Sequence, residues 1–137
     1  MKPAVTYPDP ERAVVDLLKT LIVSHHPDVT VGVGVPDGWR PSSTAHLEVA
    51  WDGTPTNAHP VADNPTIRVV ARAAGPTATK ALAQLARGLL LAHRGDTNIT
   101  AIRPGMGVLP ARDPDTRFDL ASFTVLVTVR STPIVEP

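Results

Sequence analysis

The sequence predicts an α+β domain in which two helices pack on one face of a mainly antiparallel sheet. Apolar residues recur at helical spacing in two segments, one near the N-terminus and one after Gly75. Between and after these segments, apolar and polar residues alternate with the two-residue period of strands. The resulting order is helix, three strands, helix, two strands, which is typical of helices layered on a sheet. We expect residues 1–137 to form a single domain.

The first helix is expected to begin after Asp9, a residue type that caps helix N-termini, with Pro10 at the first helical position. It should end near His25, because Pro27 follows. Its predicted buried stripe consists of Val14, Leu17, Leu18, Leu21 and Ile22.

Three strands are predicted next. In the first, residues 29–35, valines alternate with Thr30 and two glycines; no third glycine or helix follows, so we do not interpret it as a phosphate-binding loop. The second, residues 45–53, should bury Leu47, Val49 and Trp51 and expose His46, Glu48, Ala50 and Asp52. The third strand is predicted at residues 66–74. One of its faces should carry Ile67, Val69, Ala71 and Ala73, and the other Arg68, Val70 and Arg72.

The second helix is predicted to open at Gly75 and Pro76 and to end at Gly95. We expect its buried stripe to be Ala78, Leu82, Leu85, Leu89 and Ala92. A strand at Ile99–Arg103 and a final strand at Ala121–Arg130 complete the predicted sheet. Two Pro-containing irregular segments, Gly53–Pro65 and Arg103–Asp119, separate these elements.

Composition restricts the possible functions. The 13 basic residues balance 13 acidic ones, so net charge does not attract nucleic acid, and no cysteine is present. The apolar runs are too short to cross a bilayer. No nucleophile motif, metal-ligand spacing or cofactor fingerprint occurs, so we expect no enzyme, no cofactor and no metal site. The alternative is a small ligand-binding or hydrolytic domain built around His46, Glu48 and His59.

Charged side chains suggest a contact surface for another chain. Arg68 and Arg72 share one face of the third strand. In "ARDPDTRFD" charges of both signs alternate around Pro114, which disfavours a regular strand through this stretch and predicts a loop or hairpin tip. Such charges set the register of a complementary surface and exclude wrong partners. The expected interface residues in this tip are Arg112, Asp113, Asp115, Arg117 and Asp119.

The early segment "PDPERAVVDLLKTLI" and the ending "LPARDPDTRFDLASFTVLVTVRSTP" resemble the tail terminator, or tail-completion, proteins of long-tailed bacteriophages of actinobacteria. The resemblance covers nearly the whole chain. It implies an α+β subunit of a hexameric ring that caps the head-proximal end of the tail tube, stops tube growth and offers a surface to the head connector. The implied partners are other copies of the chain, the tail tube protein and the head-tail connector protein, with DNA passing through the lumen. The ring would assemble in the host cytoplasm and remain in the virion; a head-side neck or head-completion protein is the near alternative.

Overall fold

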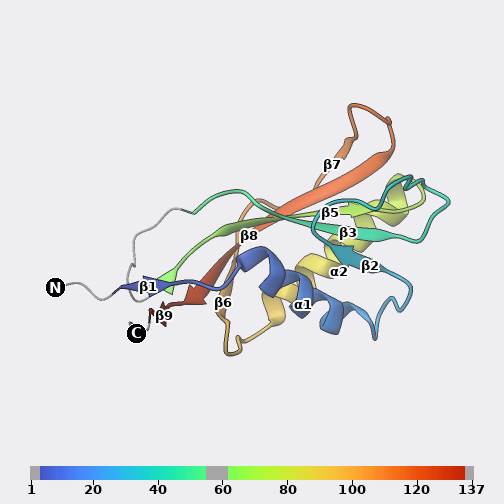
Figure 1. The fold of residues 1–137 in the computed structure, drawn as a ribbon. Helices are drawn as coiled ribbons and strands as arrows, with labels where there is room; N and C mark the ends of the chain where they lie inside the picture. Colours follow the sequence, from blue (N-terminus) through green and yellow to red (C-terminus); the bar gives the residue numbers. More distant parts are fainter. Residues whose placement is uncertain (1–3, 55–61, 135–137) are drawn as a thin grey trace.

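The computed structural model of the protein describes residues 4–54 and 62–134, and its main body is a seven-stranded sheet with two helices (Figure 1). The predicted α+β class is therefore confirmed. The helices are α1, Pro10–Ile22, and α2, Pro76–Ala92. The strands are β1 Val5–Thr6, β2 Thr30–Gly32, β3 His46–Trp51, β4 Ala62–Asp63, β5 Thr66–Arg72, β6 Ile99–Pro104, β7 Leu109–Arg112, β8 Asp119–Arg130 and β9 Thr132–Pro133.

The long strand β8 organises the sheet. Along one side it pairs with β5 and β4, and along the other with β6 and β7, always antiparallel. Strand β3 pairs antiparallel with β5, and β2 runs parallel to β3 at the outer edge. The sheet is therefore mixed but mainly antiparallel, with β2 at one edge and the successive strands β6 and β7 at the other.

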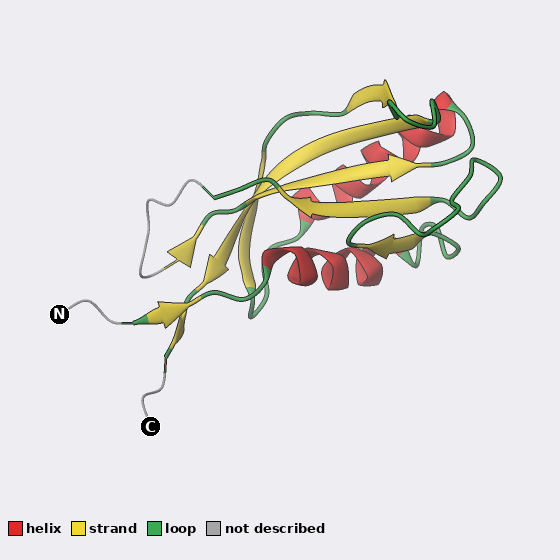
Figure 2. Ribbon diagram, turned by 45° about the horizontal axis from the view of Figure 1, so that its top comes forward, coloured by secondary structure: helices red, strands yellow, loops and turns green. Residues whose placement is uncertain are grey.

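The core lies between the helices and one face of the sheet (Figure 2). Strand β8 shows why: its alternate residues Ala121, Phe123, Val125, Val127 and Val129 are at most 1% exposed, while the residues between them are half-buried. Buried residues of α1 and α2 belong to the same apolar cluster, and the two helices also contact each other. Within the described residues, both helices lie on that face, and no helix covers the opposite face, which we call the open face.

The predicted start of α1 is confirmed, because the Asp9 side chain accepts hydrogen bonds from the backbone N–H groups of Glu11 and Arg12. The helix ends at Ile22, before the predicted end at His25. The predicted buried stripe of α2 is wrong at both ends, since Ala78 and Ala92 are exposed. The residues that α2 buries are Thr79, Leu82, Ala83, Ala86 and Leu90. Two small alanines on this line let the helix approach the sheet closely, and the leucines beside it are only half-buried.

Four short strands were not predicted, so the predicted order of elements is incomplete. Strands β1 and β9 form a separate two-stranded ribbon near the chain ends. Strand β4 lies in the expected loop Gly53–Pro65, of which residues 55–61 are outside the described part. Strand β7 interrupts the expected irregular segment Arg103–Asp119, and residues 113–118 form the turn between β7 and β8, as the proline had indicated. Strands of two to four residues carry too little periodicity to be recognised.

The first predicted strand is also shorter than expected. Only Thr30–Gly32 pairs with β3, and residues 33–45 continue as an irregular segment. Val33 is 60% exposed and Val35 is 36% exposed, so they do not continue the buried face. Gly34 has a φ of 88°, a conformation that ends a regular strand.

Candidate functional site on the open face of the sheet

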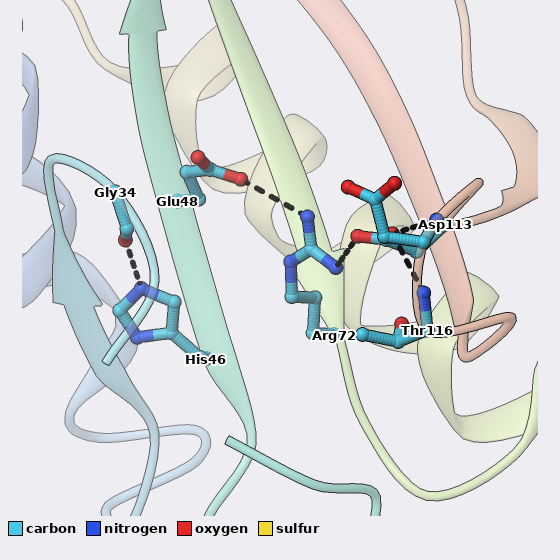
Figure 3. A network of polar contacts seen from close by, with 7 residues as sticks. Gly34, His46, Glu48, Arg72, Asp113 and Thr116 are labelled. Atoms are coloured by element: carbon cyan, nitrogen blue, oxygen red, sulfur yellow. Dashed lines mark hydrogen bonds and ion pairs between the residues drawn. The ribbon is translucent and has the colours of Figure 1, made fainter. Parts of the chain in front are cut away.

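Polar side chains from two strands and one turn meet at one end of the open face (Figure 3). Glu48 comes from β3 and Arg72 from the end of β5, while Asp113 and Thr116 belong to the β7–β8 turn. The segment 33–45 also reaches this end, since its Trp39 ring makes an edge-on contact with Phe118, with ring centres 6.2 Å apart. The site therefore links three sequence regions that lie far apart in the chain.

Arg72 is the centre of the network. Its side chain is 11% exposed and lies between two carboxylates, with 3.1 Å from Nη1 to Asp113 Oδ2 and 3.4 Å from Nη2 to Glu48 Oε1. Its Nε atom is buried and has no hydrogen-bond partner among the described residues. A buried guanidinium needs such carboxylate partners to offset its lost hydration. The ion pairs thus attach the β7–β8 turn to β5 and β3.

Asp113 also organises the turn itself. One carboxylate oxygen accepts hydrogen bonds from the backbone N–H groups of Asp115 and Thr116, at 2.8 and 3.2 Å. These two backbone hydrogen bonds, more than the neighbouring Arg72, hold the pKa of Asp113 below its usual range, and partial burial opposes them. The Asp113 carbonyl accepts from Arg117 N–H, and Arg117 has the left-handed φ of 66°. The turn is therefore fixed from inside and from the sheet.

His46 is buried, with 3% exposure, so its prediction as part of a solvent-facing row is wrong. Its Nε2 lies 2.7 Å from the Gly34 carbonyl oxygen, which can only accept; Nε2 therefore carries a proton. In the neutral ring Nδ1 then accepts from the Thr30 hydroxyl, also at 2.7 Å. The segment 33–45 covers His46, an arrangement that strand alternation cannot reveal.

Replacing His46 with alanine should lower the free energy of unfolding by about 1–3 kcal/mol, because the half-buried Gly34 carbonyl loses its donor and the buried ring is removed. Urea denaturation followed by circular dichroism measures this change. The exposed His25, replaced in the same way, is the matched control and should have almost no effect. Equal stabilities of the two variants would contradict the structural role of His46.

A cavity of about 330 Å³ lies between the segment 33–45 and the β7–β8 turn. Its walls combine the two aromatic rings with charged groups, and its lining consists of Val35, Pro36, Asp37, Gly38, Trp39, Arg72, Asp113, Thr116 and Phe118. Arg72 is already shared by two carboxylates, so the cavity offers no free cation to an anionic ligand. We interpret it as packing space between a loop and a turn.

The structure brings together only part of the predicted interface set. Arg72 and Asp113 meet, but they are engaged inside the chain and are not free to contact a partner. Arg68 pairs with Asp52 at 2.7 Å, and Arg112 lies 3.7 Å from Asp119 with its side chain 68% exposed. Asp115 and Arg117 are exposed in the turn.

Two contacts of the site were not predicted: the ion pair of Glu48 with Arg72 and the contact between the Trp39 and Phe118 rings. In the β3–β5 pair His46 lies opposite Arg72, so Glu48, two residues further along β3, is the diagonal neighbour of Arg72. An antiparallel pairing of the two predicted strands in this register would have indicated the contact. Trp39 follows the Pro-Asp-Gly sequence in an irregular segment, where no periodicity points to a distant ring.

The alternative site of His46, Glu48 and His59 gains no support from this geometry. His46 bonds Thr30 and Gly34, whereas Glu48 pairs with Arg72. His59 lies outside the described residues. Within residues 4–54 and 62–134, no three metal-ligating side chains gather, and no helix is long and apolar enough to cross a membrane. No protein-family model matches the sequence, and no curated protein matches it.

Proposed function

We propose that this chain is a ring-forming subunit of a bacteriophage neck, namely a tail terminator that caps the head-proximal end of the tail tube. The sequence resemblance suggests the role, and the surface of the fold supports it. The proposed partners are further copies of the chain in a hexamer, the tail tube protein and the head-tail connector protein, with DNA passing through the lumen. Assembly would take place in the host cytoplasm, and the ring would remain in the virion.

The observation that carries the proposal is the open edge formed by β6 and β7. Within the described residues, both strands pair only with β8, and all four residues of β7 are exposed, including Leu109 at 54%. Met106, between the two strands, is 64% exposed. An exposed sheet edge with apolar side chains is a template for contact with another chain.

A closed ring of identical subunits needs two different surfaces that fit each other. The fold offers unlike surfaces, because the β2 edge is short and parallel while the opposite edge ends in the β7–β8 turn. A ring with one face that matches the tube and another that does not would end polymerisation without any chemical step. The carboxylate pairs of Arg72 hold the turn in place before assembly, which reduces the ordering cost of binding.

Loss of the protein tests this role directly. In a phage whose gene for this chain is interrupted, we expect normal heads and unattached tails of uncontrolled length, measured by electron microscopy of infected-cell lysates. Supplying the wild-type chain from a plasmid is the control and should restore tails of uniform length. Uniform tails beside defective heads would instead indicate the head-completion alternative, and uniform, joined particles would contradict both roles.

A further inference from the structure

A cavity of about 450 Å³ lies at the end of the sheet opposite the β7–β8 turn. Parts of β1, β3, β4, β8 and the start of α1 enclose it. Its lining consists of Thr6, Tyr7, Pro8, Asp9, Pro10, Glu11, Trp51, Asp63 and Val129. Three of these side chains are carboxylates and two are aromatic, and the described lining includes no arginine or lysine.

The negative charge of this cavity is poorly compensated. One carboxylate oxygen of Asp63 is buried and has no hydrogen-bond partner among the described residues. Burial, more than the nearby Asp63 carboxylate, raises the pKa of Tyr7. Asp9 is occupied in part, since it caps α1. Asp9, Glu11 and Asp63 have no ion-pair partner within the described part of the chain, so a cationic donor entering the cavity would be favoured.

The aromatic wall selects the same kind of group. Trp51 is 45% exposed, so the prediction that it is buried with Leu47 and Val49 is wrong. Its indole N–H donates to the Thr54 hydroxyl. The face of an indole ring attracts a guanidinium or ammonium group, and carboxylates beside the ring strengthen this preference. The cavity therefore has the chemistry to accept a basic side chain of another protein chain.

The β7–β8 turn presents such a side chain. Arg117 is exposed, and its guanidinium has no ion-pair or hydrogen-bond partner within the described part of the chain. The exposed Asp115 lies in the same turn, and its negative charge offsets that of Arg117. The group that complements the cavity is therefore the Arg117 guanidinium alone, since the turn as a whole is not positively charged. The 12 residues of β8 separate turn and cavity by roughly 35–40 Å. Arg117 therefore cannot reach the cavity of its own chain.

We infer that Arg117 of one copy binds in the acidic, aromatic cavity of the next copy, so that the chain associates head to tail through its two ends. This inference rests on the proposed function, since a closed ring requires two different surfaces of each subunit. In a closed ring the same contact repeats between all neighbouring copies, so every cavity would hold one arginine.

Charge reversal on both sides of the contact tests the inference. Arg117→Glu and Glu11→Lys, each alone, should weaken self-association of the full chain by about tenfold or more, because each places like charges together. The double variant carries the reversed pair at every interface and should recover most of the association. Sedimentation velocity over a range of concentrations, at low and high salt, measures this. Exposed charges elsewhere provide matched controls, Lys80→Glu and Asp28→Lys, and these should have little effect.

Arg117→Gly separates this contact from folding. Glycine adopts the left-handed φ of 66° without strain, so the variant should unfold at the wild-type temperature or slightly above it. Its self-association should nevertheless be weaker than that of the wild-type chain, because the guanidinium is absent. A wild-type chain that stays monomeric at all concentrations, or a double variant without recovery, would overturn the inference. If Arg117→Glu still gives phage with tails of uniform length, the contact is wrong while the terminator role stands. The terminator role itself is tested by loss of the whole protein, which must give tails of uncontrolled length.

Discussion

Replacing Phe123 with alanine should lower the free energy of unfolding by about 3–5 kcal/mol, the largest effect that we expect from a single substitution. Phe123 is 1% exposed and is the largest fully buried side chain of the core. It lies on the helix-facing side of β8, opposite Val69 of β5. Neighbouring strands restrict the backbone on both sides, so the cavity left by the ring cannot collapse fully.

A loss of this size is a large fraction of the stability of an ordinary domain, which is about 5–15 kcal/mol. Urea unfolding of both proteins, followed by circular dichroism, measures the difference. The half-buried Leu126 lies on the open face of the same strand, so Leu126→Ala is the matched control and should cost no more than about 1.5 kcal/mol. Similar losses at both positions would mean that the two faces of β8 do not differ as described.

Replacing Arg72 with methionine should lower the free energy of unfolding by about 2–3 kcal/mol. Methionine keeps much of the side-chain volume but removes the cation shared by Glu48 and Asp113. Removing one partner of a buried ion pair costs up to about 5 kcal/mol, and here the two carboxylates keep a fifth of their surface in water, which reduces the loss. Arg68→Met is the control, because Arg68 is half-exposed and Asp52 is its one ion-pair partner among the described residues. Equal losses of unfolding free energy in the two variants would mean that the buried ion pairs of Arg72 do not stabilise the fold more than an exposed pair does.

Acid should weaken the same network. The pKa of Asp113 in the folded chain is below its usual value of 3.8, so the unfolded chain takes up this proton first as pH falls. The stabilisation by the Asp113 carboxylate is therefore complete above about pH 5 and is lost as pH falls through the folded-state pKa. Thermal unfolding as a function of pH should show a smaller loss between pH 5 and strongly acidic solution for Asp113→Asn than for the wild-type chain. The exposed Asp115, changed to asparagine, should retain the wild-type pH profile.

Much of the local structure could be predicted because it depends on neighbouring residues. Asp9 and Pro10 define the start of α1 through a cap that is complete within one turn of helix. The alternation in β8 predicts which residues face the core, since every second side chain of a strand lies on the same face. In contrast, the buried line of α2 depends on how closely the helix approaches the sheet, and its hydrophobic pattern alone pointed to the wrong neighbours of Leu82.

Some residues of the candidate site could be predicted from the sequence, but the contacts between them could not. Arg72 and Asp113 were singled out as charged surface residues, and nothing in their local sequence indicates that one lies beside the other. Likewise, His46 has the position of a solvent-facing residue in its strand and is buried because segment 33–45 lies over it. The burial of a polar group depends on what covers it, which is a long-range property.

The sequence by itself determined the α+β class, the two helices and the strands long enough to show a period, because these follow from apolar spacing and from caps and turns a few residues long. Only the tertiary structure decided which charges are paired and which remain free. It joined Arg72 to Asp113 across 41 residues of chain, left Arg117 without a partner in the described part, and enclosed Asp63 in an acidic cavity at the other end. The physical reason is that a charge is stabilised or left unpaired by groups within a few ångströms, and strand pairing, not chain order, brings those groups together.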